Sequence, residues 1–163
     1  MTRLRVPLGF VCGAIAFWLA RPTPVSVLAG MTVATVGEFI RLWAAGHIDK
    51  GREITRSGPY RFIRHPLYAG SAIMGIGFMI AARSLSSAFV VGVYVVVALV
   101  SAARAEEATL DARFAGEYSA YREGRAVPSD RPFSLARVKA NREYRAVIGL
   151  ILGCGLLYLR SQM

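Results

Sequence analysis

The chain has 163 residues, enough for one domain, and 55% of them are hydrophobic. Its 20 Lys and Arg outnumber its 10 Asp and Glu, which gives a net charge of +10. No zinc-ligand spacing and no RNA-binding aromatic motif accompanies these charges, which argues against nucleic-acid binding. Two cysteines, both inside apolar segments, predict neither a disulfide framework nor a metal site.

The charged residues stand in blocks between stretches that carry almost none. Five apolar segments are predicted as transmembrane helices, although most are shorter than the roughly 20 residues that cross a bilayer comfortably. The sequence therefore predicts an all-α fold, a single domain over 1–163 that forms an integral membrane bundle of about five helices. These spans cover about 6–20, 25–43, 67–82, 85–104 and 145–160.

The basic residues alternate in register with these five segments. With the N-terminus inside, 17 of the 20 Lys and Arg fall on the cytoplasmic side, and only Arg21, Arg83 and Arg160 fall outside. Such a bias is the usual orientation signal of membrane proteins, and a soluble helical bundle has no reason to produce it. We expect a cytoplasmic N-terminus, an outside C-terminus and anionic lipid headgroups around the basic segments.

The first two segments form a hairpin broken at Pro22 and Pro24, since proline cannot continue a helix. Near the end of the second, Glu38 and Arg41 stand three residues apart and can pair on one helix face. Such a pair is either functional or only an anchor of the helix end. The polar stretch 47–66 is predicted to be mostly loop because glycine and proline punctuate it.

The third and fourth spans join in a tight turn at 83–84. An amphipathic helix follows over 106–123, and we expect it to leave the membrane and cover the cytoplasmic ends of the spans. One stripe of this helix carries Glu107, Leu110, Phe114, Tyr118 and Tyr121, and Glu106 lies about 100° away from it.

Residues 127–141 are predicted to be irregular, before a last span that contains Gly149 and Gly153. This small-xxx-small pattern permits close helix packing, either within the monomer or in a homodimer.

Two polar clusters belong to the same membrane face. One is the segment 57–70, rich in Arg, Tyr, Gly and Pro and containing His65, and the other contains Glu106 and Glu107 where the fourth span emerges. An interfacial belt of Tyr and Arg explains single residues of the first cluster. It gives no reason for two adjacent glutamates beside it, so the clusters predict a functional site.

The sequence from Gly58 to Gly70, GPYRFIRHPLYAG, followed by EEATL from Glu106 and FAGEYSAY from Phe114, resembles a known family. It is similar to the isoprenylcysteine carboxyl methyltransferase and phospholipid methyltransferase superfamily of integral membrane enzymes. The likeness covers about half of the chain, from Arg41 to Arg122. Two features depart from the family pattern, namely Phe114-Ala-Gly in place of Phe-Gly and the span after residue 145.

The resemblance implies S-adenosyl-L-methionine as cofactor, bound between the Arg64-His65-Pro66 region and the two glutamates. This cofactor carries a sulfonium and an ammonium, which carboxylates attract, and a carboxylate that an arginine binds. The implied cofactor-binding residues are Tyr60, Arg64, His65, Pro66, Tyr68, Gly70, Glu106 and Glu107.

The resemblance also suggests roles in the reaction. An amine acceptor must lose a proton before attack, so His65 or a glutamate such as Glu107 is the expected base. A carboxylate acceptor needs no base and would be oriented by an arginine, for which Arg122 is the candidate. Arg41, Tyr118, Tyr121 and Arg122 are the expected substrate-binding residues.

We therefore expect a membrane methyltransferase acting on a lipid, without a metal, in the cytoplasmic membrane of a bacterium. An amine headgroup of a phospholipid is favoured over an isoprenylcysteine carboxylate. The composition is typical of bacterial proteins, and the prenylation of proteins is chiefly a eukaryotic process. The alternatives are a sterol-type reductase, which shares only the Arg-His-Pro-Leu-Tyr element, and a membrane scaffold or small transporter without enzyme activity. A transporter should carry polar residues deep in several spans, and here only Glu38 approaches that description.

Overall fold

The computed structural model describes residues 5–49, 53–123, 125 and 129–163, and these form helices and loops without a strand. The helices are α1 (Arg5–Leu19), α2 (Pro24–Ala45), the short 3-10 helix η2 (Gly58–Arg61), α3 (Pro66–Ala82), α4 (Leu85–Arg122), α5 (Leu135–Ala140) and α6 (Tyr144–Arg160). The predicted all-α class is confirmed. Arg3, Lys50, Arg52 and Val127 lie outside the described residues.

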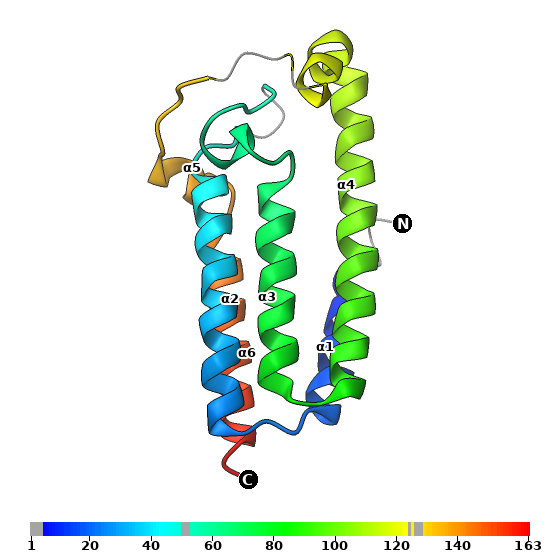
Figure 1. Cartoon of the computed structure of the whole chain (residues 1–163), viewed down its shortest axis with the longest axis vertical. Helices are drawn as coiled ribbons and strands as arrows, with labels where there is room; N and C mark the ends of the chain where they lie inside the picture. Colours follow the sequence, from blue (N-terminus) through cyan, green and yellow to red (C-terminus); the bar gives the residue numbers. More distant parts are fainter. Residues whose placement is uncertain (1–4, 50–52, 124, 126–128) are drawn as a thin grey trace.

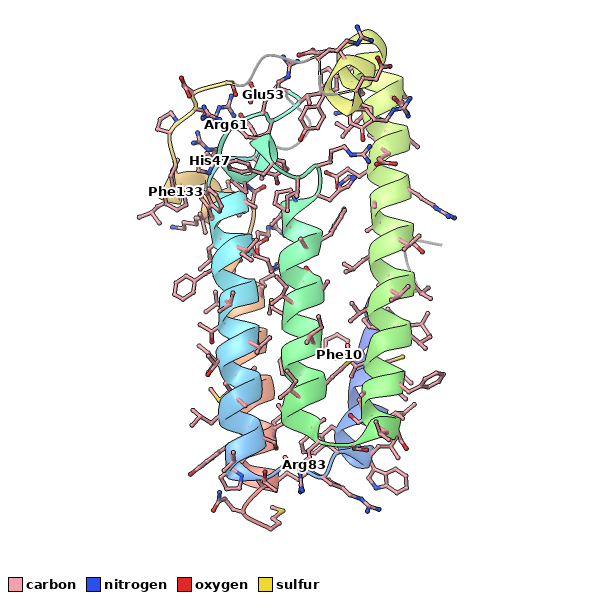
Figure 2. All side chains as sticks on the ribbon, viewed as in Figure 1. Phe10, His47, Glu53, Arg61, Arg83 and Phe133 are labelled. Carbon is pink, nitrogen blue, oxygen red and sulfur yellow. The ribbon has the colours of Figure 1, made fainter. Side chains whose placement is uncertain are left out.

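Helices α2, α3 and α4 stand side by side, with α6 behind α2 (Figure 1). Helix α1 lies against only one half of α4. The end of the bundle on this side is called the hairpin end, because the connections from α1 to α2 and from α3 to α4 both lie there. Arg83 marks this end in Figure 2. The opposite end, with His47, Glu53 and Arg61, is the loop end.

Local sequence explains both hairpins. Thr23 caps α2 in a capping box with Ser26, whose backbone N–H donates to the Thr23 hydroxyl at 3.2 Å, and Pro24 follows at the first helical position. Arg83 ends α3 in a left-handed conformation, with φ 46°. The Arg21 N–H donates to the Ala82 carbonyl at 2.8 Å, which ties the two connections together.

Glycines let α2 and α3 approach at backbone distance. A Cβ on Gly77 would lie 2.6 Å from the Ala34 nitrogen, and one on Gly70 would lie 2.6 Å from the Gly37 carbonyl oxygen. Gly70 therefore has a packing role, and the expectation that it binds the cofactor stays a prediction. The close approach fixes the height of α3 against α2, and with it the position of His65 at the start of α3.

Helix α4 is longer than expected and contains a bend. The predicted span 85–104 and the predicted helix 106–123 form one element, which breaks at Phe114 (φ −133°, ψ 38°). The end of α4 then turns across the loop end (Figure 1). The predicted fold-back is present, but it begins at Phe114 and not where the apolar run ends.

The segment after α4 also differs from the expectation, because 135–140 form the short helix α5 inside the stretch predicted as irregular. In α6, a Cβ on Gly153 would lie 2.8 Å from the Phe78 ring, so this glycine packs within the chain. A Cβ on Gly149 would meet nothing within 4 Å. A homodimer through Gly149 and Gly153 stays a prediction.

Two helical segments are long and apolar enough to cross a membrane, Pro24–Ala45 with a mean hydropathy of 1.5 and Leu85–Phe114 with 2.3. Shorter apolar helices cover Pro7–Leu19 and Pro66–Ala82. Only 6% of the apolar stretch of α4 is buried, whereas a core helix of a soluble protein buries its apolar face. The helices are thus compatible with an integral membrane protein, and the count of five spans stays a prediction.

Candidate active site

The two polar clusters meet at the loop end. The loop before α3 delivers His65, which precedes Pro66, the first residue of α3. His65 Nε2 lies 3.0 Å from Glu107 Oε1, and the Tyr68 hydroxyl donates to Glu106 Oε2 at 2.6 Å. The rings of His65 and Tyr68 stack with their centroids 5.5 Å apart. The two clusters are therefore in contact, as the sequence predicted.

Between this loop and α4 lies a cavity of about 190 Å³, the polar cavity. Six residues predicted from the sequence line it: Tyr60, Arg64, His65, Glu106, Tyr118 and Tyr121. Leu110 and Phe114 of the expected stripe line it too, and the lining residues not predicted from the sequence are Ile48, Glu53, Ile54, Thr55, Thr109 and Arg113.

The face of α4 that lines the cavity matches the expected stripe except at Glu107. Positions 106, 109, 110, 113 and 114 face the cavity, which is a regular helical spacing, so Glu106 belongs to the cavity wall. Glu107 does not line the cavity and contacts His65 instead. The other members of the stripe, Leu110, Phe114, Tyr118 and Tyr121, all line the cavity.

Five other predicted residues do not line the polar cavity, and one of them, Tyr68, is linked to it by its hydrogen bond to Glu106. Pro66 is fully buried and only begins α3, and Gly70 packs on α2. Arg122 is exposed at the end of α4, which places the candidate for carboxylate orientation outside the cavity. Arg41 lies further into the bundle, where its guanidinium is 3.5 Å from Glu38 and 2.7 Å from Glu143.

Buried polar groups in the cavity wall lack partners. The Thr55 Oγ1 and the Tyr60 hydroxyl are buried without a hydrogen-bond partner among the described residues. Burying a polar group without a hydrogen bond costs free energy of folding, so such groups usually have a partner. Burial, followed by the charge of Glu106, raises the pKa of Tyr60 far above its ordinary value, and burial together with the charge of Glu107 raises the pKa of Tyr118 to about 12. Both phenols therefore remain hydrogen-bond donors at neutral pH.

Ion pairs hold the chain around the cavity. Arg61 contacts Asp130, and Arg56 contacts Glu117 beyond the bend of α4. The Tyr121 hydroxyl donates to the Tyr60 carbonyl at 2.9 Å. These contacts fix the end of α4 and the segment around 130 on the loop.

The donor set fits S-adenosylmethionine. Glu106 offers negative charge to the sulfonium and ammonium, as does Glu53, although Arg131 already contacts Glu53 at 2.7 Å. Arg64 and Arg113 offer positive charge to the carboxylate, and the unpartnered hydroxyls can bond a ribose or a base. The volume is below the roughly 300–1,000 Å³ of small-molecule sites. A cavity of this volume has room for only part of a ligand of that size.

The apolar helical bundle is compatible with a membrane protein, and the small polar cavity at its loop end is suited to a polar ligand. Residues 8–117 match the phospholipid methyltransferase family, which is about two thirds of the chain. The chain belongs to this family. The resemblance seen in the motifs is thereby confirmed, and the family indicates a membrane methyltransferase.

Two curated relatives are similar to part of the chain. The nickel-cobalt-cadmium resistance protein NccN of Alcaligenes xylosoxydans xylosoxydans is 36% identical over 74 residues, which is 43% of this chain and 33% of the relative. The cobalt-zinc-cadmium resistance protein CzcN of Cupriavidus metallidurans is 34% identical over 87 residues, 46% of this chain and 39% of the relative. The matches thus span little more than a third of these relatives. No solved structure matches the chain.

Proposed function

We propose that the protein transfers a methyl group from S-adenosylmethionine to the amine headgroup of a membrane phospholipid. The observation that carries this proposal is the polar cavity, where carboxylates, guanidinium groups and unpartnered hydroxyls gather at the end of an apolar bundle. The family match covers more of the chain than either metal-resistance relative does. The proposal therefore follows the family and not the names of the relatives.

Glu106 is the main anchor for the positive charges of the cofactor. It projects from a rigid helix, and Tyr68 holds one of its oxygens at 2.6 Å. Arg64, across the cavity, binds the cofactor's carboxylate. The chemistry that S-adenosylmethionine supplies is an electrophilic methyl group on a positively charged sulfur. The chain contributes the position of the two reactants and the exclusion of water.

His65 is the proposed base. When Glu107 accepts a hydrogen bond from Nε2–H, Nδ1 of the same ring is left as a proton acceptor. An ammonium headgroup must lose a proton before its nitrogen can attack a methyl group. The His65–Glu107 pair thus favours an amine acceptor over the isoprenylcysteine carboxylate, which has no proton to lose.

Methyl transfer to the lipid is the direct test. Purified protein is incubated with S-adenosylmethionine carrying a labelled methyl group and with phosphatidylethanolamine vesicles, and label in the lipid is measured. We expect transfer by the native chain and a loss of about 10²-fold or more for His65→Ala. The control is Arg125→Ala, which changes an exposed ion pair with Glu123. Failure of the native chain to label the lipid would contradict the proposal.

We also propose that the loop end faces the cytoplasm, because most of the basic residues are sorted to that side. Single cysteines are placed at Ser129 and Ser84, which are exposed and partly exposed, in a chain without Cys12 and Cys154, and labelled in intact cells with a membrane-impermeant maleimide. The cysteine at position 84, at the hairpin end, should react from outside, and the one at position 129 only after the cells are opened. Reaction of both positions from the same side would overturn the orientation.

A further inference from the structure

A second and larger cavity lies within the bundle. It has a volume of about 740 Å³ and is bounded by α1, α3, α4 and α6. Its walls are mainly apolar, with Phe17, Met74, Phe78, Val91 and Leu156 among the lining residues. An apolar cavity of only ~150 Å³ already takes a benzene-sized molecule. The space is therefore large enough for a long hydrocarbon group.

One end of this apolar cavity is polar. Arg41 and Ser71 line it there, and Arg41 is the only charged side chain in the described lining. Arg41 contacts the Ser71 hydroxyl and donates from Nη2 to Glu143 Oε2 at 2.7 Å. Neither Glu143 nor Glu38 lines the cavity, so the charged group that meets an occupant is the guanidinium, although the two carboxylates behind it offset part of its charge. A guanidinium is suited to a phosphate.

The polar end points toward the proposed methyl-transfer site. Tyr60 lines the polar cavity and packs with Ala44 of α2, one turn beyond Arg41. Arg41 itself contacts Ser71 in the first turns of α3, the helix that follows His65 directly. The polar end of the apolar cavity is therefore the end nearer the loop that carries His65.

Part of the apolar cavity lies outside the family match. Glu143 and the lining residues of α6, such as Gly153 and Leu156, follow residue 117, where the match ends. Arg160 closes the hairpin end of this wall by donating to the Ala20 carbonyl at 3.0 Å, and its guanidinium lies over the Phe17 ring. Helix α6 thus adds both a wall and the partner of Arg41.

We propose that the apolar cavity binds one hydrocarbon chain of a phosphate-bearing lipid, with the phosphate at Arg41, and that α6 makes this chain-binding site. The proposal rests on the proposed function, in that the bound lipid is the methyl acceptor. Two features of the cavity favour this occupant. The guanidinium at the polar end can bind a phosphate, and the apolar walls can pack against a hydrocarbon chain.

Two glycines provide a matched test. Gly13 lines the cavity, and a Cβ there meets nothing within 4 Å, so Gly13→Leu fills the cavity without pushing on a neighbour. Gly155 is equally unobstructed but does not line the cavity, so Gly155→Leu is the control. Native mass spectrometry of the protein released from detergent counts retained phosphatidylethanolamine. We expect the native chain and Gly155→Leu to retain it, and Gly13→Leu to lose it by at least tenfold.

A second measurement uses the native chain and does not depend on how a variant folds. Cys12 lines the cavity, so added phosphatidylethanolamine should slow its reaction with an apolar maleimide, and diacylglycerol, which lacks the phosphate, should slow it much less. Equal protection by both lipids would overturn the role of Arg41. Equal lipid retention by Gly13→Leu and the native chain would overturn the chain-binding site.

These results separate the site from the proposed function. Calorimetry with S-adenosylmethionine should give the same affinity for Gly13→Leu as for the native chain, because position 13 is outside the polar cavity. Lipid retention without any cofactor binding would support the apolar site and contradict methyl transfer. Methyl transfer with unchanged lipid retention in Gly13→Leu would support the enzyme and contradict this site.

Discussion

Glu106→Ala is expected to weaken the binding of S-adenosylmethionine by roughly 2–4 kcal/mol, because a cation then loses a carboxylate inside a partly closed cavity. That loss corresponds to about 30- to 700-fold in the dissociation constant, measured by calorimetry. Glu107→Ala should cost less binding, since Glu107 lies outside the cavity wall and contacts His65. The helical stripe alone predicts the opposite ranking.

The same two variants separate binding from catalysis. If Glu107 orients His65, Glu107→Ala should lower the rate of methyl transfer at saturating cofactor, and Glu107→Gln should recover part of it by accepting a hydrogen bond from Nε2–H. Thermal unfolding of all three variants checks that the fold is kept. An equal or larger loss of cofactor affinity in Glu107→Ala than in Glu106→Ala would refute the assignment of faces.

Arg41→Met should be the most destabilising single change in the bundle. It would leave Glu38 and Glu143, whose side chains are only 6% and 5% exposed, without their positive partner. Removing one member of a buried ion pair costs about 3–5 kcal/mol. Thermal unfolding in detergent should show a large drop in the melting temperature.

The partners of Arg41 supply the control. Replacing all three residues together, with Glu38→Gln and Glu143→Gln added to Arg41→Met, should recover much of the lost stability, because no uncompensated charge is then buried. A single variant as stable as the native chain would show that the three groups do not depend on one another. No recovery in the triple variant would mean that Arg41 stabilises through packing and not through charge.

The sequence determined the elements because their signals are local. Helices α1, α2, α3 and α6 begin and end within two residues of the predicted spans, since the boundaries depend on proline, glycine and runs of apolar residues. The motifs around His65 and Glu106 also identified the family, because motif order and spacing are properties of the chain itself.

The tertiary structure decided which side chains share a cavity. The loop before α3 contacts one side of α4, and this contact places Glu106, Thr109 and Arg113 in the wall and Glu107 against His65. Helical periodicity gives the angle between two residues of one helix, but it does not tell which side of the helix a distant loop will contact. The spacing of 106, 109 and 113 was nonetheless a readable signal of a common face.

Glu143 is the clearest case of a residue beyond the reach of sequence patterns. It lies 102 positions from Arg41 and forms with it the buried contact that positions the guanidinium. Such a contact exists only because α2 packs against α6 and brings Glu143, which precedes α6, to the guanidinium of Arg41. Local patterns thus specify the helices and their ends. The pairing of distant charges depends on how the helices pack, because a charged side chain that packing buries away from water must find a partner of opposite charge.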